Sequence, residues 1–127
     1  MTEQLSSHFW SGRKVLPTCI VLHYTAGEGL KSAIRAMDVV GTSAHYVVDV
    51  DGAVVQVVKP ENRAFHAGES AWNGLSGVNN LSIGIEIVNF GYGSVGEDRR
   101  LFRLANKQPY FAKAKPIVVA SDPRPNW

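Results

Sequence analysis

The sequence predicts an α/β fold, and three patterns of apolar residues support that prediction. A continuous apolar run at residues 18–24 is typical of a strand that is buried on both faces. Apolar residues at helical spacing between 28 and 40 indicate an amphipathic helix. Two β-rich segments around a short polar pair, within 45–58, indicate a β-hairpin. The chain has 127 residues, so we expect these elements to share one domain with a buried core.

The first strand and the helix follow each other directly. The run at 18–24 (TCIVLHY) ends at Thr25-Ala26-Gly27, which favours an exit from the strand. In the helix, Lys31 and Arg35 are expected to face water, and Gly41-Thr42-Ser43 should end it. The opposite face of the helix carries the apolar residues Leu30, Ile34 and Met37.

The hairpin is predicted from residues 45–50 and 53–58, which flank Asp51-Gly52. An Asp-Gly pair between two β-rich segments favours a type I′ turn. Residues 63–78 are rich in Gly, Ser, Asn and Trp and predict a long structured loop. Loops of this length are often functional.

A strand at residues 79–89 carries a carboxylate in an unusual place. With a period of two, Ser82, Gly84, Glu86 and Val88 share one face, and three isoleucines share the other. Glu86 therefore stands on a face with little bulk, as the floor of a groove would require. From this pattern alone, a solvated glutamate on an edge strand is the alternative.

Composition excludes several classes of protein. A net charge of +2 is too small to indicate nucleic-acid binding. No apolar run approaches the roughly 20 residues that span a bilayer, and the N-terminus lacks the features of a secretory signal. Cys19 is the only cysteine, so no internal disulfide can form. We expect a cytoplasmic monomer.

Three of the four histidines are candidates for chemistry. His23 ends the first strand, where α/β proteins often place ligands, and is either a buried structural histidine or a metal ligand. His45 begins the hairpin and is either a structural hydrogen-bonding group or a groove residue. His66 lies in the loop, where small neighbours would let a ligand approach. No two histidines show the local spacing of a metal motif.

Five motifs in order give the chain its resemblance to a known family. They are IVLHYTAG (20–27), SAHY (43–46), DGAVVQ (51–56), AFHAG (64–68) with Trp72, and NLSIGIE (80–86). Over about residues 17–93, the chain resembles the zinc-dependent N-acetylmuramoyl-L-alanine amidases of the type 2 family. This group includes cytoplasmic recycling amidases, phage endolysins and peptidoglycan recognition proteins. The resemblance implies a central mixed β-sheet flanked by helices.

The resemblance also implies a reaction and a role for each site residue. His23 would be a ligand of the zinc ion (Zn²⁺), and Glu86 would be the general base. Activated water would attack the lactyl carbonyl that joins N-acetylmuramic acid to L-alanine, in peptidoglycan or muropeptides. The groove would be lined by His45, His66, Trp72 and Asn80. For Trp72, an indole that packs in the core or anchors the loop is the alternative.

The chain departs from the family's pattern near its C-terminus. The family completes its zinc site there with a second histidine, an Asp or Cys ligand and a lysine, after a long amphipathic helix. No histidine follows His66, and Ala112 and Ala120 occupy the expected histidine and lysine positions. Residues 97–127 form a Pro-interrupted segment with 7 Lys/Arg and 3 Asp/Glu, unlike residues 1–96.

We therefore expect an amidase-like domain at 1–96, without the C-terminal helix and the closing zinc motif, followed by a divergent basic tail at 97–127. The hypothesis is a truncated or frameshifted amidase, which the DNA past codon 95 would test. Three alternatives remain: a catalytically impaired domain that binds peptidoglycan or muropeptides, a destabilised chain with one sheet face uncovered, and recruitment of His45 or His66 as a ligand beside His23.

Overall fold

The structure is a computed structural model that describes residues 1–91, 93–95 and 101–103. It contains two compact units, Met1–Gly91 and Tyr92–Trp127. In the second unit, the described residues form an antiparallel pair of strands, β10 (Gly93–Val95) and β11 (Leu101–Arg103). The predicted boundary at residue 96 falls in this unit, and most of the predicted tail lies outside the described residues.

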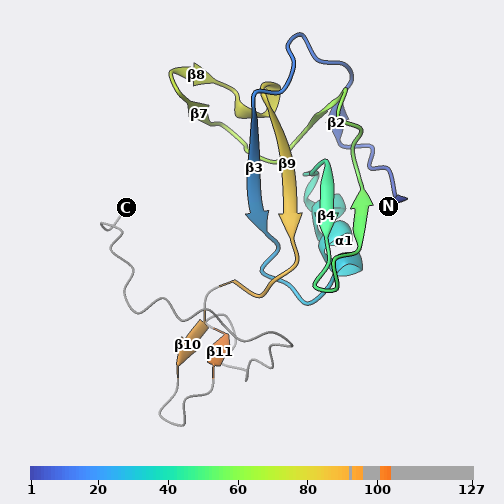
Figure 1. Cartoon of the computed structure of the whole chain (residues 1–127), viewed down its shortest axis with the longest axis vertical. Helices are drawn as coiled ribbons and strands as arrows, with labels where there is room; N and C mark the ends of the chain where they lie inside the picture. Colours follow the sequence, from blue (N-terminus) through green and yellow to red (C-terminus); the bar gives the residue numbers. More distant parts are fainter. Residues whose placement is uncertain (92, 96–100, 104–127) are drawn as a thin grey trace. The chain divides into compact units, whose positions relative to one another are not determined.

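The first unit is built on a five-stranded mixed sheet in the order β1-β5-β4-β9-β3 (Figure 1). Strands β4 and β5 are antiparallel, whereas β9 runs parallel to both of its neighbours, β3 and β4. This arrangement confirms the predicted α/β class and the mixed sheet. The strands are β1 (Thr2–Glu3), β3 (Cys19–Tyr24), β4 (Tyr46–Val48), β5 (Val54–Gln56) and β9 (Ser82–Ile87).

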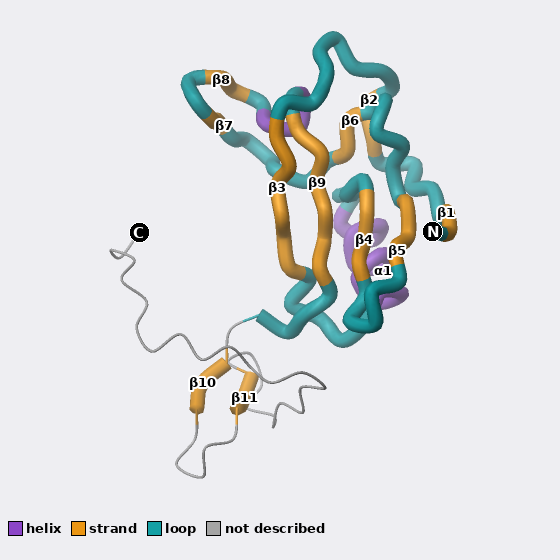
Figure 2. Tube along the Cα trace, in the orientation of Figure 1, coloured by secondary structure: helices purple, strands orange, loops and turns teal. Residues whose placement is uncertain are grey.

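Helix α1 (Leu30–Val40) covers one face of this sheet, behind β4 in Figure 2. Ala33 and Ile34 are buried against the sheet, while Lys31 and Arg35 are exposed, as the helical spacing predicts. The helix ends at Gly41, whose φ of 75° is left-handed and whose N–H bonds to carbonyls of the last turn. The buried core comprises Ala33, Ile34, Val47, Val55, Val57 and Val88.

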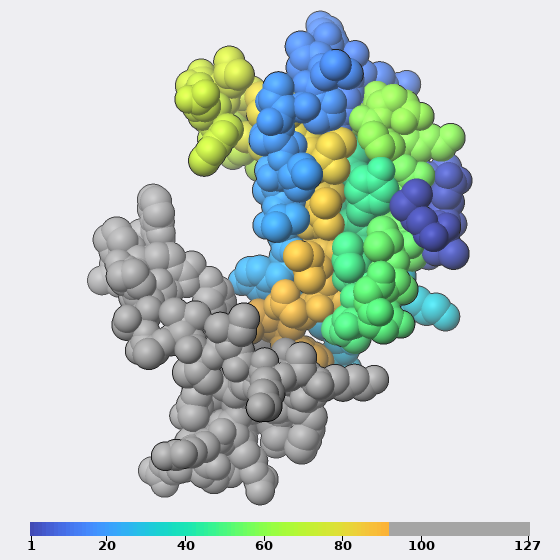
Figure 3. Space-filling view, viewed as in Figure 1, coloured from blue at the N-terminus to red at the C-terminus, as the bar shows by residue number. Residues whose placement is uncertain are grey.

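The prediction that β3 is buried on both faces is wrong. β3 lies at the edge of the sheet, and its residues alternate between partly buried and exposed. Ile20 is 63% exposed and Leu22 is 64% exposed. They point away from the face that α1 covers, and Figure 3 shows β3 and β9 side by side on the visible surface. Continuous apolar sequence therefore does not establish burial, which depends on what covers each face.

The predicted hairpin is confirmed, but its turn is not type I′. That turn needs positive φ at both central residues, and only Gly52 has it, with φ of 85°. Asp49 N donates to the Ala53 carbonyl (2.8 Å), and Gly52 N donates to the Asp49 carbonyl (3.0 Å). The result is a three-residue loop with a left-handed glycine in its last position.

The predicted loop at 63–78 contains short strands. β6 (Arg63–Ala64) pairs with β2 (Phe9–Trp10), and β7 (Ala71–Trp72) pairs with β8 (Leu75–Ser76). Asn73-Gly74 joins the last two with φ of 50° and 77°, so the type I′ signature lies here. A short 3-10 helix, η1 (Val78–Asn80), leads into β9.

None of the helices in the described part of the chain has the length and apolar character needed to cross a membrane.

Candidate functional site

The sheet brings His23 and Glu86 together. β3 and β9 are parallel neighbours (Figure 1), and their register pairs His23 with Glu86. Paired residues on adjacent strands point to the same face, so both side chains lie on the face that carries α1. On the other side of Glu86 the register places Val47, which is fully buried. β9 is thus an interior strand, and the edge-strand alternative is wrong.

Glu86 lies in a half-buried position with an unsatisfied acceptor. Its Oε2 atom is buried and has no hydrogen-bond partner among the described residues. Burial raises the pKa of Glu86 above 4.5, and the charge of nearby His23 partly opposes that shift. A partly desolvated carboxylate with a free oxygen is suited to proton transfer.

His66 occupies the space above the small face of β9. A Cβ atom at position 84 would lie against the His66 ring, closer than real Cβ atoms approach. Gly84 is therefore required so that the ring can pack on the strand. The sequence showed the lack of bulk on this face, but not which side chain fills it.

His23 and His66 form a direct pair. His23 Nε2 lies 3.1 Å from His66 Nδ1, with the rings at 70°. The other nitrogen of His66, Nε2, lies 3.1 Å from Ser82 Oγ. Burial, and then the charges of His23, His45 and Arg13, lower the pKa of His66 to about 4. His66 is therefore neutral at pH 7.

His45 has a structural role in this arrangement. Its side chain has no exposed surface. Its ring atom Nδ1 accepts a hydrogen bond from the backbone N–H of Gly84 (2.9 Å). The backbone N–H of His45 in turn donates to the Gly84 carbonyl (2.9 Å). Burial lowers the pKa of His45. The hydrogen bond with the Asn62 carbonyl raises this pKa, whereas the charge of Arg13 lowers it further. The expected direct contact with substrate does not fit a side chain in this position.

Arg13 is a residue that sequence reasoning missed. Its guanidinium donates to the carbonyls of Pro60 (2.6 Å), Asn80 (3.2 Å) and Ser82 (2.8 Å). It also lies 2.7 Å from His45 Nε2. Arg13 thus ties together three segments around the site. No periodicity or motif marks it, because its partners are backbone carbonyls distant in sequence.

The two asparagines at the end of η1 have different surroundings. Asn79 is buried, and its Oδ1 accepts from the N–H groups of His66 (3.1 Å) and Ala67 (2.9 Å). Asn80, the predicted substrate residue, is exposed, and its Oδ1 accepts from Arg63 (3.1 Å). Asn79 therefore positions the His66 loop, a role that the sequence did not indicate.

Trp72 lies on the β7–β8 hairpin with 66% of its surface exposed. It is therefore not a core residue, and the alternative that it packs in the core is wrong, whereas an indole that anchors the loop stays an alternative. Its predicted contact with substrate stays a prediction.

Two hollows adjoin Glu86 on the α1 side of the sheet, and both include Met37 and Thr42 in their walls. The first, of about 230 Å³, is the more polar in its lining and adds Ser43, Phe65, His66, Gly68 and Asn79. The second, of about 220 Å³, is mainly apolar and adds Tyr24, Thr25, Ala33, Ala36 and Val40. Glu86 therefore stands where two differently lined spaces meet.

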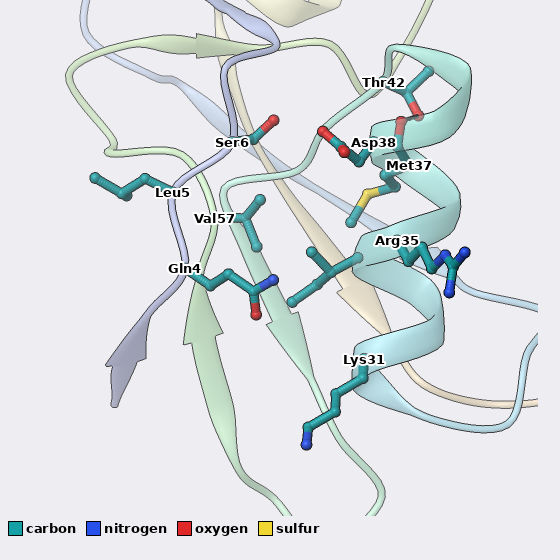
Figure 4. A pocket seen from close by; sticks show the side chains of 10 residues that line it. Gln4, Leu5, Ser6, Lys31, Arg35, Met37, Asp38, Thr42 and Val57 are labelled. Atoms are coloured by element: carbon teal, nitrogen blue, oxygen red, sulfur yellow. Dashed lines mark hydrogen bonds between the residues drawn. The ribbon is translucent and has the colours of Figure 1, made fainter.

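A larger hollow of about 300 Å³ lies between the N-terminal segment and α1 (Figure 4). Gln4 and Leu5 line one side, and Lys31, Arg35 and Asp38 lie along the helix. None of the predicted site residues belongs to it, so we do not assign it to the site.

The described residues do not by themselves fit a catalytic zinc ion. Such an ion normally has three protein ligands and a water. Within the described ranges, no group of three or more His, Cys, Asp or Glu side chains is arranged to hold a metal. His23 and His66 offer two neighbouring nitrogens, but at 3.1 Å these already bond to each other.

Comparison with known proteins agrees with this geometry. The family model described as N-acetylmuramoyl-L-alanine amidase matches residues 11–115. The chain belongs to the N-acetylmuramoyl-L-alanine amidase family. The match extends past residue 93, where the resemblance drawn from the motifs ends. It also confirms the resemblance drawn from those motifs.

Individual relatives give the same result. AmiD of Escherichia coli is 35% identical over 80 residues, which cover 58% of this chain and 29% of that protein. The crystal structure of an AmpD derivative has a TM-score of 0.57 at 28% identity and covers 69% of this chain and 60% of that one. The structure of E. coli AmiD in complex with the substrate anhydro-N-acetylmuramic acid-L-Ala-D-gamma-Glu-L-Lys has a TM-score of 0.51 at 30% identity. This match covers 80% of this chain and 38% of that one. In the sequence alignment, this chain spans less than a third of the length of AmiD.

Proposed function

We propose that this chain is an amidase domain that hydrolyses the amide bond between N-acetylmuramic acid and L-alanine in peptidoglycan or muropeptides. The observation that carries the proposal is Glu86, a half-buried carboxylate with a free oxygen, beside His23 and between two hollows. Family membership and the likeness to AmiD, whose complex contains such a substrate, support the choice of bond.

The chemistry that Glu86 can perform follows from its position. Its carboxylate takes a proton from water, and the water oxygen attacks the lactyl carbonyl to form a tetrahedral intermediate. The protonated Glu86 then gives its proton to the departing nitrogen of L-alanine, and the C–N bond breaks. The products are a lactyl carboxylic acid, which then ionises, and a free amine. The raised pKa of Glu86 assists the second transfer.

The two hollows suit a substrate with two unlike halves. We propose that the sugar and the peptide lie on opposite sides of Glu86, with His66 lining the hollow of about 230 Å³. Contacts of Trp72 and Asn80 with substrate are part of the same proposal, because both side chains are exposed.

Zinc is the cofactor that the family implies, and we propose His23 as the residue that would hold it. A zinc ion held there would supply Lewis-acid chemistry by lowering the pKa of a bound water. Since the described residues do not complete a three-ligand site, the steps above are assigned to Glu86 and water alone. The predicted cytoplasmic location and monomeric state are further parts of the proposal.

An activity assay with a single matched pair of variants tests the function. The purified chain is incubated with anhydro-N-acetylmuramoyl-tripeptide, and release of the free peptide is followed by mass spectrometry. We expect Glu86→Gln to reduce the rate at least about 100-fold, the usual worth of a general base. Glu61→Gln, at an exposed position, should retain the rate. Equal rates in the two variants would contradict the role of Glu86.

A domain that binds the same muropeptide without cleaving it is the second candidate. It is favoured by the lack of a third ligand among the described residues. Calorimetric binding of the muropeptide with no released peptide would support it. Stoichiometric zinc in the dialysed protein would count against it.

A further inference from the structure

The protons around His66 can be placed from one buried hydroxyl. Ser82 is fully buried at the start of β9, and its Oγ lies 2.6 Å from the carbonyl oxygen of Val78. A carbonyl oxygen only accepts, so the single proton of the hydroxyl must point to Val78. Toward any other neighbour, Ser82 Oγ can therefore only accept.

This direction fixes the tautomer of His66. His66 Nε2 lies 3.1 Å from Ser82 Oγ, which accepts, so Nε2 must carry the proton. A neutral imidazole has only one N–H. Nδ1 of His66 is then an acceptor. The loop is held in this orientation by the hydrogen bonds that the backbone N–H groups of His66 and Ala67 donate to Asn79.

The same logic reaches His23. His66 Nδ1 lies 3.1 Å from His23 Nε2, and it has a lone pair to offer rather than a proton. His23 must therefore donate from Nε2, which leaves the lone pair of its own ring on Nδ1. The four groups form a directed chain from His23 through His66 and Ser82 to the Val78 carbonyl.

We infer that Ser82 and His66 are positioning residues that fix His23 in the Nε2–H tautomer and make Nδ1 its one nitrogen available to a ligand. Such outer partners orient a ligating or catalytic imidazole and select its reactive nitrogen. The use of Nδ1 in the site rests on the proposed function, whereas the tautomer itself does not.

The packing of β9 supports the inference independently of the hydrogen bonds. The lack of a side chain at Gly84 leaves room for the His66 ring, because a Cβ atom there would overlap the ring atoms. Ser82 precedes Gly84 by two residues and therefore lies on the same face. Strand β9 thus supplies both the glycine against which the His66 ring packs and the serine oxygen that accepts its N–H.

Nitrogen NMR of the histidine rings tests the inference without substrate. The chain is labelled with ¹⁵N-histidine, kept with a chelator at pH 8, and the His23 signals are assigned by their loss in His23→Gln. We expect His23 and His66 each to show a protonated Nε2 and an unprotonated Nδ1. A hydrogen bond worth about 1 kcal/mol corresponds to a tautomer ratio of roughly fivefold to tenfold.

Variants of the acceptor separate positioning from a general loss of structure. In Ser82→Ala the His66 N–H loses its acceptor, so both histidines should become mixtures of tautomers. Ser82→Thr keeps a hydroxyl and should restore the single tautomer. Ser76→Ala, at an exposed position of β8, is the control and should match the parent.

Two results would overturn the inference. One is a spectrum of the parent chain in which His23 is protonated at Nδ1 or is an even mixture of the two tautomers. This result can be seen without any variant. The other is a folded Ser82→Ala whose His23 and His66 signals equal those of the parent. Because the spectra need no turnover, an inactive chain still gives a decisive result, and failure of the proposed function is recognised separately in the peptide-release assay.

Discussion

At the scale of single residues, Glu86 should reduce the stability of the fold that it serves. Its pKa is raised by burial, so the folded state favours the protonated form. This contribution to stability is complete below the unfolded pKa and is lost as the pH rises through the folded pKa. We therefore expect Glu86→Gln to be more stable than the parent at pH 7, with the difference shrinking below pH 4.5. Urea unfolding of the variant and the parent, at pH 7 and below pH 4.5, measures this difference. A variant that is less stable than the parent at pH 7 would contradict the expectation.

His66 should make the chain sensitive to acid. Its pKa falls from 6.5 to about 4 on folding, because burial and nearby positive charges disfavour the imidazolium. A depressed folded pKa contributes stability above pH 6.5, and that contribution is lost as the pH falls toward 4. The free energy of unfolding should therefore drop between these values. In His66→Phe the drop should be smaller, as followed by thermal unfolding at stepped pH; an unchanged slope would assign it to other groups.

The site shows which residues a sequence can and cannot place. His23 and Glu86 were found because each interrupts an apolar strand, a pattern that is local in the chain. Their proximity follows once β3 and β9 pair in parallel. The partners Asn79 and Arg13 act through backbone groups far away in sequence, and no local pattern encodes such contacts. The seat of His66 on Gly84 depends in the same way on how a loop folds back.

At the scale of elements, the two glycines that bound α1 should respond to different extents to the same substitution. Gly41 ends the helix with φ of 75°, a region that costs an L-residue about 1 kcal/mol. Gly29 begins it with φ of −175°, where an added Cβ meets nothing within 4 Å. Gly41→Ala should thus lose about 1 kcal/mol of stability, and Gly29→Ala should lose less, since it carries only the modest cost of alanine at an N-cap. Denaturant unfolding of both variants provides the comparison, and equal losses would contradict the backbone argument.

The turns show why dipeptides are weaker signals than their context. Asp51-Gly52 and Asn73-Gly74 both lie between β-rich segments, yet only the second adopts positive φ at both positions. In the first, Asp51 Oδ1 accepts from the Ala53 N–H (2.9 Å), which favours a wider loop. The sequence correctly located a hairpin at Asp51-Gly52, but the turn type depended on this side-chain bond. The hairpin at Asn73-Gly74 carried a usable signal that the loop assignment overlooked.

At the scale of the whole molecule, the α/β class and the mixed sheet could be predicted, but the burial of each face could not. The run at 18–24 is apolar on both sides of the strand. α1 covers only the side that carries His23, and no described element covers the side of Ile20 and Leu22. Composition records that a strand is apolar, while its exposure depends on elements elsewhere in the chain.

This asymmetry of the sheet leads to a paired prediction for two isoleucines. Ile34 on α1 is 7% exposed within the core, whereas Ile20 on β3 is 63% exposed. Removing a buried isoleucine side chain costs about 2–5 kcal/mol, since it loses transfer energy and leaves a cavity. Ile34→Ala should cost that much, and Ile20→Ala should cost less than about 1 kcal/mol. Denaturant unfolding at several protein concentrations measures both. A loss at Ile20 as large as that at Ile34 would mean that this face is covered in solution, and a dependence on concentration would identify a second copy as the cover.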